Sequence, residues 1–194
     1  MARKRRKKWV VCAICLSLII AVSVAVAASS LTAKILLNIG IEYSVTDDLS
    51  TKEAPIRKSR GVSLANGTGA NQADTVFQNI GTLTDDANET LRLHDGSLEN
   101  DFGTALTLDI LKVLYVKNNS SDANLLIGGA DANQVALFVD DVNGILKLPP
   151  GGEFLLIAPD VNGIDIDPNS DLEMKHDGTG SDSLTYDIII VGVD

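Results

Sequence analysis

Cysteine is nearly absent from this chain of 194 residues, and its two copies, Cys12 and Cys15, both lie close to the N-terminus. The remainder has no disulfide framework, so its own core must stabilise it. Histidine is equally scarce: His94 and His176 have no later cysteine to join them in a conventional zinc site. No Gly-x-Ser-x-Gly elbow marks a serine as a nucleophile. These absences argue against an enzyme and leave no catalytic residue to name.

Aromatic residues are also few, at 4% of the chain, and the single tryptophan, Trp9, belongs to the N-terminal segment. The phenylalanines and tyrosines are scattered, and most fall inside strand patterns. We therefore expect them to pack in a core, which weakens the case for a carbohydrate-binding face.

Basic residues are scarce after residue 30, where ten Lys and Arg oppose 26 Asp and Glu, a formal net charge of about −16. A nucleic-acid partner requires a basic footprint, so this composition excludes that class of partner. The acidic surface is expected to keep an exposed protein soluble.

The N-terminus has the opposite character. Six basic residues between positions 3 and 8 precede an uncharged run over residues 9–30, and about 20 apolar residues as a helix match a bilayer core. The basic cluster should remain cytoplasmic, so the chain beyond it is expected to be exported. Two interpretations stay open: a signal peptide cleaved after Ala27 in the Ala25-Val26-Ala27 motif, or a membrane anchor retained over residues 9–28.

Beyond residue 30 the pattern is one of strands and turns. Apolar and polar residues alternate over short segments, and Asn-Gly, Asp-Gly and Pro-Gly signals separate them. Many short strands with such turns predict a sandwich or barrel. The expected strands cover residues 35–45, 75–83, 89–94, 106–117, 124–127, 135–139, 145–148, 153–158, 172–175 and 185–193. Over 106–117 periodicity alone leaves a helix open, and the β-branched and aromatic residues at its end favour a strand.

The expected organisation is an N-terminal hydrophobic helix (1–30), an N-terminal strand and linker (31–60) and a β-sandwich domain (61–194) that is all-β and jelly-roll-like. Residues 47–60 are polar and are interpreted as a linker, or as an arm that becomes ordered on assembly. Residues 186–193 are nearly all apolar, as expected of a central strand buried on both faces, although such a strand is also a candidate for pairing at a sheet edge.

The densest acidic stretch is a weak calcium candidate. Oxygen-bearing side chains fall at every second position there, namely Asp165, Asp167, Asn169, Asp171 and Glu173. A helical calcium loop requires Gly at its sixth position and Glu at its twelfth, and counting from Asp165 finds Ser170 and His176 instead. We prefer an acidic loop between two strands, with a looser calcium site as the alternative, and we expect no other cofactor.

Several segments resemble small β-rich structural proteins of tailed phages and prophages. They cover residues 63–77, 101–107, 126–130, 148–160 and 186–192. Each is a turn or strand motif, and their order and spacing carry the resemblance, which covers about two-thirds of the chain. The resemblance implies a virion or particle component without enzymatic activity. The N-terminal export segment departs from that family, whose members are expected to lack one.

Two hypotheses follow for function. The first is a non-catalytic structural subunit of a virion or extracellular particle, which forms a homo-oligomer or assembles with other particle proteins. The alternative is an exported or membrane-anchored envelope module that binds a glycan or protein. In both, the protein lies outside the cytoplasmic membrane, at a virion, a cell surface or an extracellular site.

Overall fold

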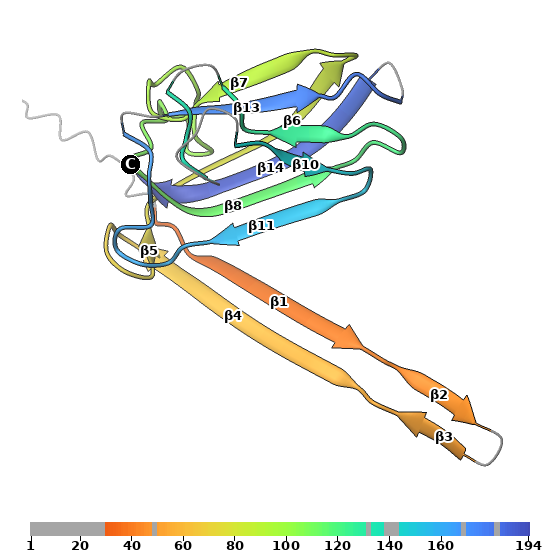
Figure 1. The fold of residues 1–194 in the computed structure, drawn as a ribbon. Coiled ribbons are helices and arrows are strands. Elements are labelled where there is room, and N and C mark those ends of the chain that lie inside the picture. The colour runs from red at the N-terminus through yellow and green to blue at the C-terminus, as the bar shows by residue number, and fades with distance from the viewer. Residues whose placement is uncertain (1–29, 48–49, 131–132, 138–143, 168–169, 181–182) are drawn as a thin grey trace, which may run out of the picture.

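A computed structural model describes residues 30–47, 50–130, 133–137, 144–167, 170–180 and 183–194 (Figure 1). Every regular element in these ranges is a β-strand, which confirms the all-β prediction. The predicted hydrophobic helix falls on residues 1–29, outside the described ranges. Within them, no helix has the length and apolar character needed to cross a membrane.

The body consists of two antiparallel sheets. The first has the order β11-β8-β14-β6, and β12 pairs with the far end of β8; the second has the order β10-β9-β13-β7. The first sheet comprises β6 (Thr75–Thr84), β8 (Ile110–Asn118), β11 (Glu153–Ile157), β12 (Ile164–Asp165) and β14 (Ser183–Val193). The second comprises β7 (Asn88–Arg92), β9 (Leu125–Ile127), β10 (Leu146–Leu148) and β13 (Asp171–His176).

The strand pairs of the body are nested along the chain. β9 pairs with β10, β8 with β11, β7 with β13 and β6 with β14. This is the pairing of one long hairpin whose two arms run side by side. Additional ladders join β13 to β9 and β14 to β8, so the hairpin is rolled into two layers.

The main core lies between these two sheets and is mostly aliphatic. Strand alternation directs every second side chain inward, as in β13, where Leu172, Met174 and His176 are buried. Tyr186 is the largest fully buried side chain, and its hydroxyl donates to Glu89 Oε2 at 2.8 Å, which links β14 to β7. The ring fills the space that a side chain at Gly81 would occupy, because a Cβ there would lie 2.2 Å from it. Burial, followed by the hydrogen bond to Glu89, raises the pKa of Tyr186.

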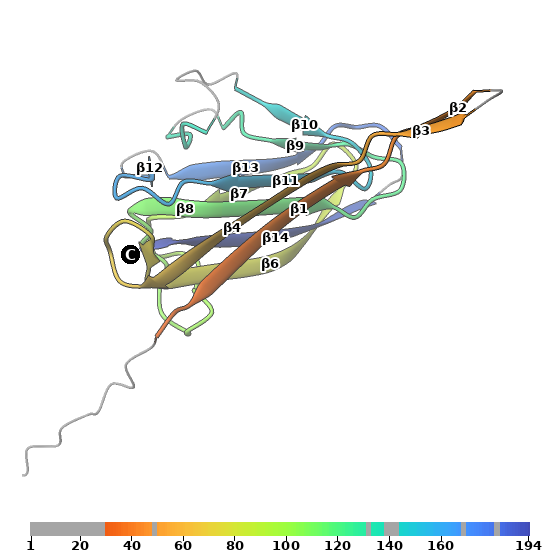
Figure 2. The ribbon, with the colours of Figure 1, turned by 90° about the horizontal axis from the view of Figure 1, so that it is seen from below.

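A β-ribbon leaves the body at one end. β1 (Ala33–Ile41) and β4 (Ile56–Asn66) pair in antiparallel register over nine positions, and β2 (Ser44–Asp47) and β3 (Ser50–Glu53) form its tip. β5 (Gln72–Ala73) pairs in parallel with the base of β4. Figures 1 and 2 show the ribbon extending past the body, with the β2–β3 tip at its far end.

The ribbon corrects the prediction of a linker over residues 47–60. Residues 50–53 and 56–60 lie in strands, and Ala54 N–H donates to the Tyr43 carbonyl at 2.8 Å between the two ladders. The polar composition that favoured a loop belongs to strands exposed to solvent. Backbone pairing with a distant partner, β1, determines the local structure here.

Most other predicted strands are present, with shifts at their ends. The predicted strand over 106–117 begins only at Ile110, and residues 135–137 of the predicted strand 135–139 are not in a strand; residues 138–139 fall outside the described ranges. β14 lies between β8 and β6, so its prediction as a central strand is confirmed and its candidacy for edge pairing is wrong. The expectation that both of its faces are buried is also wrong, because Ile189 is 38% exposed.

Candidate interaction surface

His94 lies between two acidic side chains at one end of the body. Its Nδ1 is 3.2 Å from the Leu108 carbonyl oxygen and 3.3 Å from Asp109 Oδ1, and its Nε2 is 3.9 Å from Asp167 Oδ1. His94 lies in the loop after β7, and its three partners come from the loops before β8 and after β12. Through these contacts the imidazole connects the loop after β7 to the loops beside β8 and β12.

His176 is fully buried in β13. Its Nδ1 accepts the Gly178 N–H at 3.0 Å, which assigns the ring proton to Nε2 in the neutral form. The Asp85 carboxylate lies 3.8 Å from the same Nδ1, beyond hydrogen-bond distance. The geometry gives this histidine a structural role in the turn that follows β13.

The calcium candidates are not gathered into one site. Asp165 lies in β12 and is exposed, Asp167 faces His94, and Asp171 begins β13. Asn169 lies outside the described ranges. Across the described part of the chain, no three His, Cys, Asp or Glu side chains form a group that could hold a metal ion.

A second, smaller apolar cluster anchors the base of the ribbon. Leu64 of β4 and Ala73 of β5 are buried against Val113 of β8 and Val191 of β14, on the side of that sheet facing away from the main core. Ala33, Ile35 and Val62 of the ribbon pack against the same cluster. One face of the ribbon therefore packs on this sheet at the base of the ribbon.

The same face continues outward without a cover. Cross-strand partners share a face of a strand pair, so the pairs Leu37–Arg60, Ile39–Lys58 and Ile41–Ile56 lie in line with the buried pairs at the base. We call Leu37, Ile39, Ile41 and Ile56 the apolar ribbon face; their exposed fractions are 43%, 44%, 51% and 59%. The basic side chains Lys58 and Arg60 lie among them.

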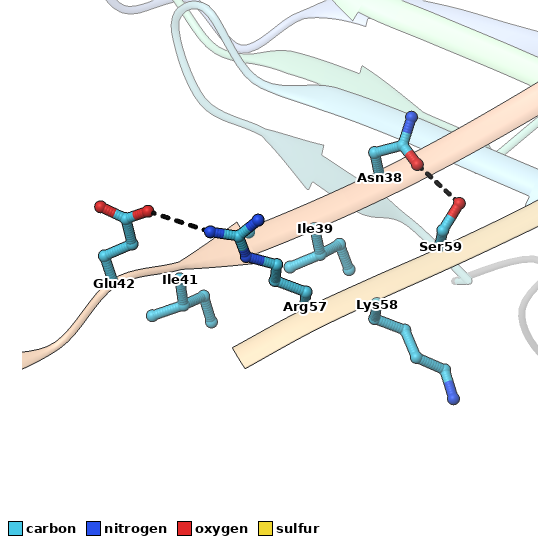
Figure 3. A pocket seen from close by; sticks show the side chains of 8 residues that line it. Asn38, Ile39, Ile41, Glu42, Arg57, Lys58 and Ser59 are labelled. Carbon is cyan, nitrogen blue, oxygen red and sulfur yellow. Dashed lines mark hydrogen bonds and ion pairs between the residues drawn. The ribbon is translucent and has the colours of Figure 1, made fainter. Parts of the chain in front are cut away.

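The opposite face of the ribbon is mostly polar, although Leu36 lies on it and is 60% exposed. Ser59 Oγ donates to Asn38 Oδ1 at 2.7 Å, and Arg57 lies 3.6 Å from Glu42 in an exposed ion pair. Figure 3 shows these two pairs on one side of the ribbon and Lys58 pointing away from them. An exposed ion pair contributes little to stability. The concentration of exposed aliphatic side chains on one face of the ribbon therefore requires an explanation.

Sequence reasoning assigned residues 35–45 to a strand but did not identify this surface. Alternation shows that a face is apolar, and it does not show whether another element covers that face. The feature that marks this surface is that Lys58 and Arg60 lie beside aliphatic residues. Because these neighbours are on the other strand, the feature can be recognised only when the β1–β4 register is known.

A buried lysine was also missed. Lys112 is fully buried in β8, next to the place where the ladder with β14 shifts register. Its Nζ donates to the backbone carbonyls of Asp160 and Val161. Burial lowers the pKa of Lys112, and the nearby Asp160 carboxylate opposes that shift. These contacts tie the loop after β11 to the sheet, which is a structural role.

Comparison of the chain with models of protein families, with characterised proteins and with solved structures found no match in any of the three. A function for this chain is therefore inferred from its own geometry, and in particular from the apolar ribbon face.

Proposed function

We propose that this chain is a non-catalytic structural subunit of a virion or extracellular particle, and that it assembles through its β-rich surface. The observation that carries the proposal is the apolar ribbon face, which lies outside the body and leaves four large aliphatic side chains exposed. Contiguous exposed apolar surface marks interaction sites in soluble proteins.

The topology of the body supports this proposal. Four nested strand pairs that lie in two sheets, with β12 as an additional strand of the first sheet, are the pairing expected of a jelly roll and support that part of the proposal. Viral capsid proteins use this architecture, and so do lectin domains. Fold alone does not assign function, so the jelly roll supports the proposal only together with the exposed ribbon.

The sequence adds two further supports. The resemblance to small structural proteins of tailed phages implies a particle component. The basic N-terminus followed by an apolar run predicts export. In the proposed arrangement, the body and the ribbon lie beyond the membrane, and the segment over residues 9–28 is either removed or holds each subunit at the bilayer.

The test is the mass of the full chain in solution, measured by size-exclusion chromatography with light scattering in a mild detergent whose mass is subtracted. We expect a trimer, a pentamer or a larger species, unchanged when calcium replaces a chelator. A monomer at every concentration would contradict self-assembly and would favour the alternative, an envelope module that binds a glycan or another protein.

A further inference from the structure

The body carries an exposed surface that matches the apolar ribbon face. On the β11-β8-β14-β6 sheet, the side facing away from the main core presents exposed Ile80 and Ile189 and half-buried Tyr115 and Leu155, which are cross-strand or diagonal neighbours. We call these four residues the outer sheet face. Leu155 also packs against the cluster at the base of the ribbon, so this surface begins where that contact ends. Ile80 and Ile189 have exposed fractions of 72% and 38%. Tyr115, Asp187 and Ile189 help to line a shallow hollow in it.

Within one chain, the continuations of these two surfaces already pack together. Ile35 and Val62, at the base of the ribbon, contact the cluster that contains Val113 and Val191. Val113 precedes Tyr115 by two positions on β8, and Val191 follows Ile189 by two positions on β14, so each pair shares a side of the sheet. The base of the ribbon therefore packs on the sheet through aliphatic side chains. The exposed parts of the two surfaces carry side chains of the same kind.

The ribbon does not follow its own sheet. Nine consecutive β1–β4 pairs keep it extended, and Figures 1 and 2 show it leaving the body toward the β2–β3 tip. To fold back, the ladder would have to bend sharply. The distal residues Ile39, Ile41 and Ile56 are therefore left exposed within one chain.

Charge favours a second copy as that molecule. Residues 31–60 carry five basic and four acidic side chains, whereas residues 61–194 carry five basic and 22 acidic ones. Two basic side chains, Lys58 and Arg60, lie on the apolar ribbon face. Two acidic side chains, Asp187 and Glu153, flank the outer sheet face. Lys117 forms an ion pair with Glu153 there at 3.6 Å. Burial, with the carboxylates of Glu153 and Asp187, raises the pKa of Tyr115.

We propose that the apolar ribbon face of one copy packs against the outer sheet face of a second copy, with Lys58 and Arg60 beside Asp187 and Glu153. This inference rests on the proposed function and names the contact through which the subunits assemble. Because the two surfaces differ, each copy can hold one neighbour with its ribbon and receive another on its sheet. Contacts of this kind build rings or filaments.

The first test is cross-linking between two variants of the full chain, both carrying Cys12→Ser and Cys15→Ser so that no other thiol is present. One variant carries Ile39→Cys and an affinity tag, and the other carries Ile189→Cys without a tag. A short thiol-specific cross-linker added to the mixture should join tagged to untagged chains. Asn38→Cys replaces Ile39→Cys in the control, because it lies next along β1 on the polar face and should give at least tenfold less product.

The second test compares two charge reversals on β4. Arg60→Glu lies on the apolar ribbon face and should weaken self-association by tenfold or more, measured by light scattering over a dilution series. Arg57→Glu makes the same charge change on the polar face, three residues away, and should leave association within about twofold. Circular dichroism confirms that both variants are folded.

The outcomes separate this inference from the proposed function. Cross-linking at Ile39 together with the Arg60-specific effect supports the contact. Assembly that persists in Arg60→Glu, without cross-linking, overturns the contact and leaves the structural subunit intact. A third variant carries both Ile39→Cys and Ile189→Cys in one chain. A cross-linked product found only in that variant also overturns the contact, since the ribbon would then close on its own sheet. A monomeric parent chain overturns both proposals.

Discussion

At the residue scale, polar side chains inside the body hold its loops together. Asp177, just after β13, has a side chain that is only 8% exposed. It accepts hydrogen bonds from Asn124 Nδ2 at 2.7 Å, Thr179 Oγ1 at 2.6 Å and Lys147 Nζ at 3.0 Å. Burial alone would raise the pKa of Asp177, but these donors outweigh it and hold the pKa well below its usual range.

This arrangement predicts a stability term that depends on pH. The pKa of Asp177 is lower in the folded protein than in the unfolded chain, where it is about 3.9. Its contribution to the free energy of unfolding is therefore complete above about pH 3.9 and is lost as the pH falls toward the lower pKa of the folded state. Asp177→Asn should lower the free energy of unfolding by roughly 1–3 kcal/mol at pH 7, and the difference should shrink below pH 4. Urea unfolding at pH 7 and pH 3 measures this, with the exposed Asp101→Asn as control. An equal difference at both pH values would contradict it.

Buried polar residues of this kind were largely beyond sequence reasoning. Asn118 is fully buried, and its Nδ2 donates to the carbonyls of Ala123 at 2.8 Å and Leu148 at 3.1 Å. In the sequence it stands in an Asn-Asn-Ser-Ser run that is typical of an exposed turn. One partner lies in the connection before β9 and the other at the end of β10, and only the tertiary structure places them together.

At the element scale, the alternation of β14 was predictable and its surroundings were not. Ile189 and Ile190 are consecutive and chemically identical, yet Ile190 is 1% exposed within the main core and Ile189 is on the outer sheet face. The sequence shows an unbroken apolar run there, which periodicity alone cannot divide between two faces. The registers with β6 and β8 make the division.

A matched pair of substitutions tests this division. Ile190→Ala removes buried methyl groups and leaves a cavity, so it should lower the free energy of unfolding by about 2–4 kcal/mol. Ile189→Ala should cost less than about 1 kcal/mol in the isolated subunit, because most surface changes are small. Chemical denaturation at low protein concentration measures both. Equal losses would show that the outer sheet face is not exposed in the folded subunit.

The ribbon is the element that sequence reasoning assigned least well. Residues 56–60 contain three basic side chains near Pro55, a composition typical of loops. They form a strand because each residue of β1 from Ala33 to Ile41 supplies a backbone partner in β4. Pairing between segments more than a dozen residues apart is invisible to a local pattern.

At the scale of the whole molecule, charge is unevenly distributed. Residues 61–194 have a formal net charge of −17, whereas residues 31–60 have +1. A compact body with this excess of carboxylates destabilises itself by self-repulsion. At about 0.1 M salt, the repulsion between exposed charges more than about 10 Å apart is largely screened.

Thermal stability should therefore increase with ionic strength. Between 20 and 300 mM sodium chloride, we expect the Tm of the Arg60→Glu variant, taken as the weakly associating form, to rise by roughly 2–4 °C, as expected for about 1 kcal/mol in a domain of this size. Differential scanning fluorimetry measures it. A fall in Tm would show that attractive ion pairs, such as Lys147–Asp177, outweigh the repulsion.

The sequence by itself determined the all-β class, the positions of most strands and the acidic character of the body, because alternation, turn residues and charge are local properties. It also carries the prediction of export, which rests on residues 1–30. The tertiary structure alone decided that the strands pair as a rolled hairpin, that residues 56–60 join a ribbon, and that the apolar ribbon face lies uncovered. Those features depend on which distant segments share hydrogen bonds and which faces remain without a neighbour, and neither is encoded at any single position.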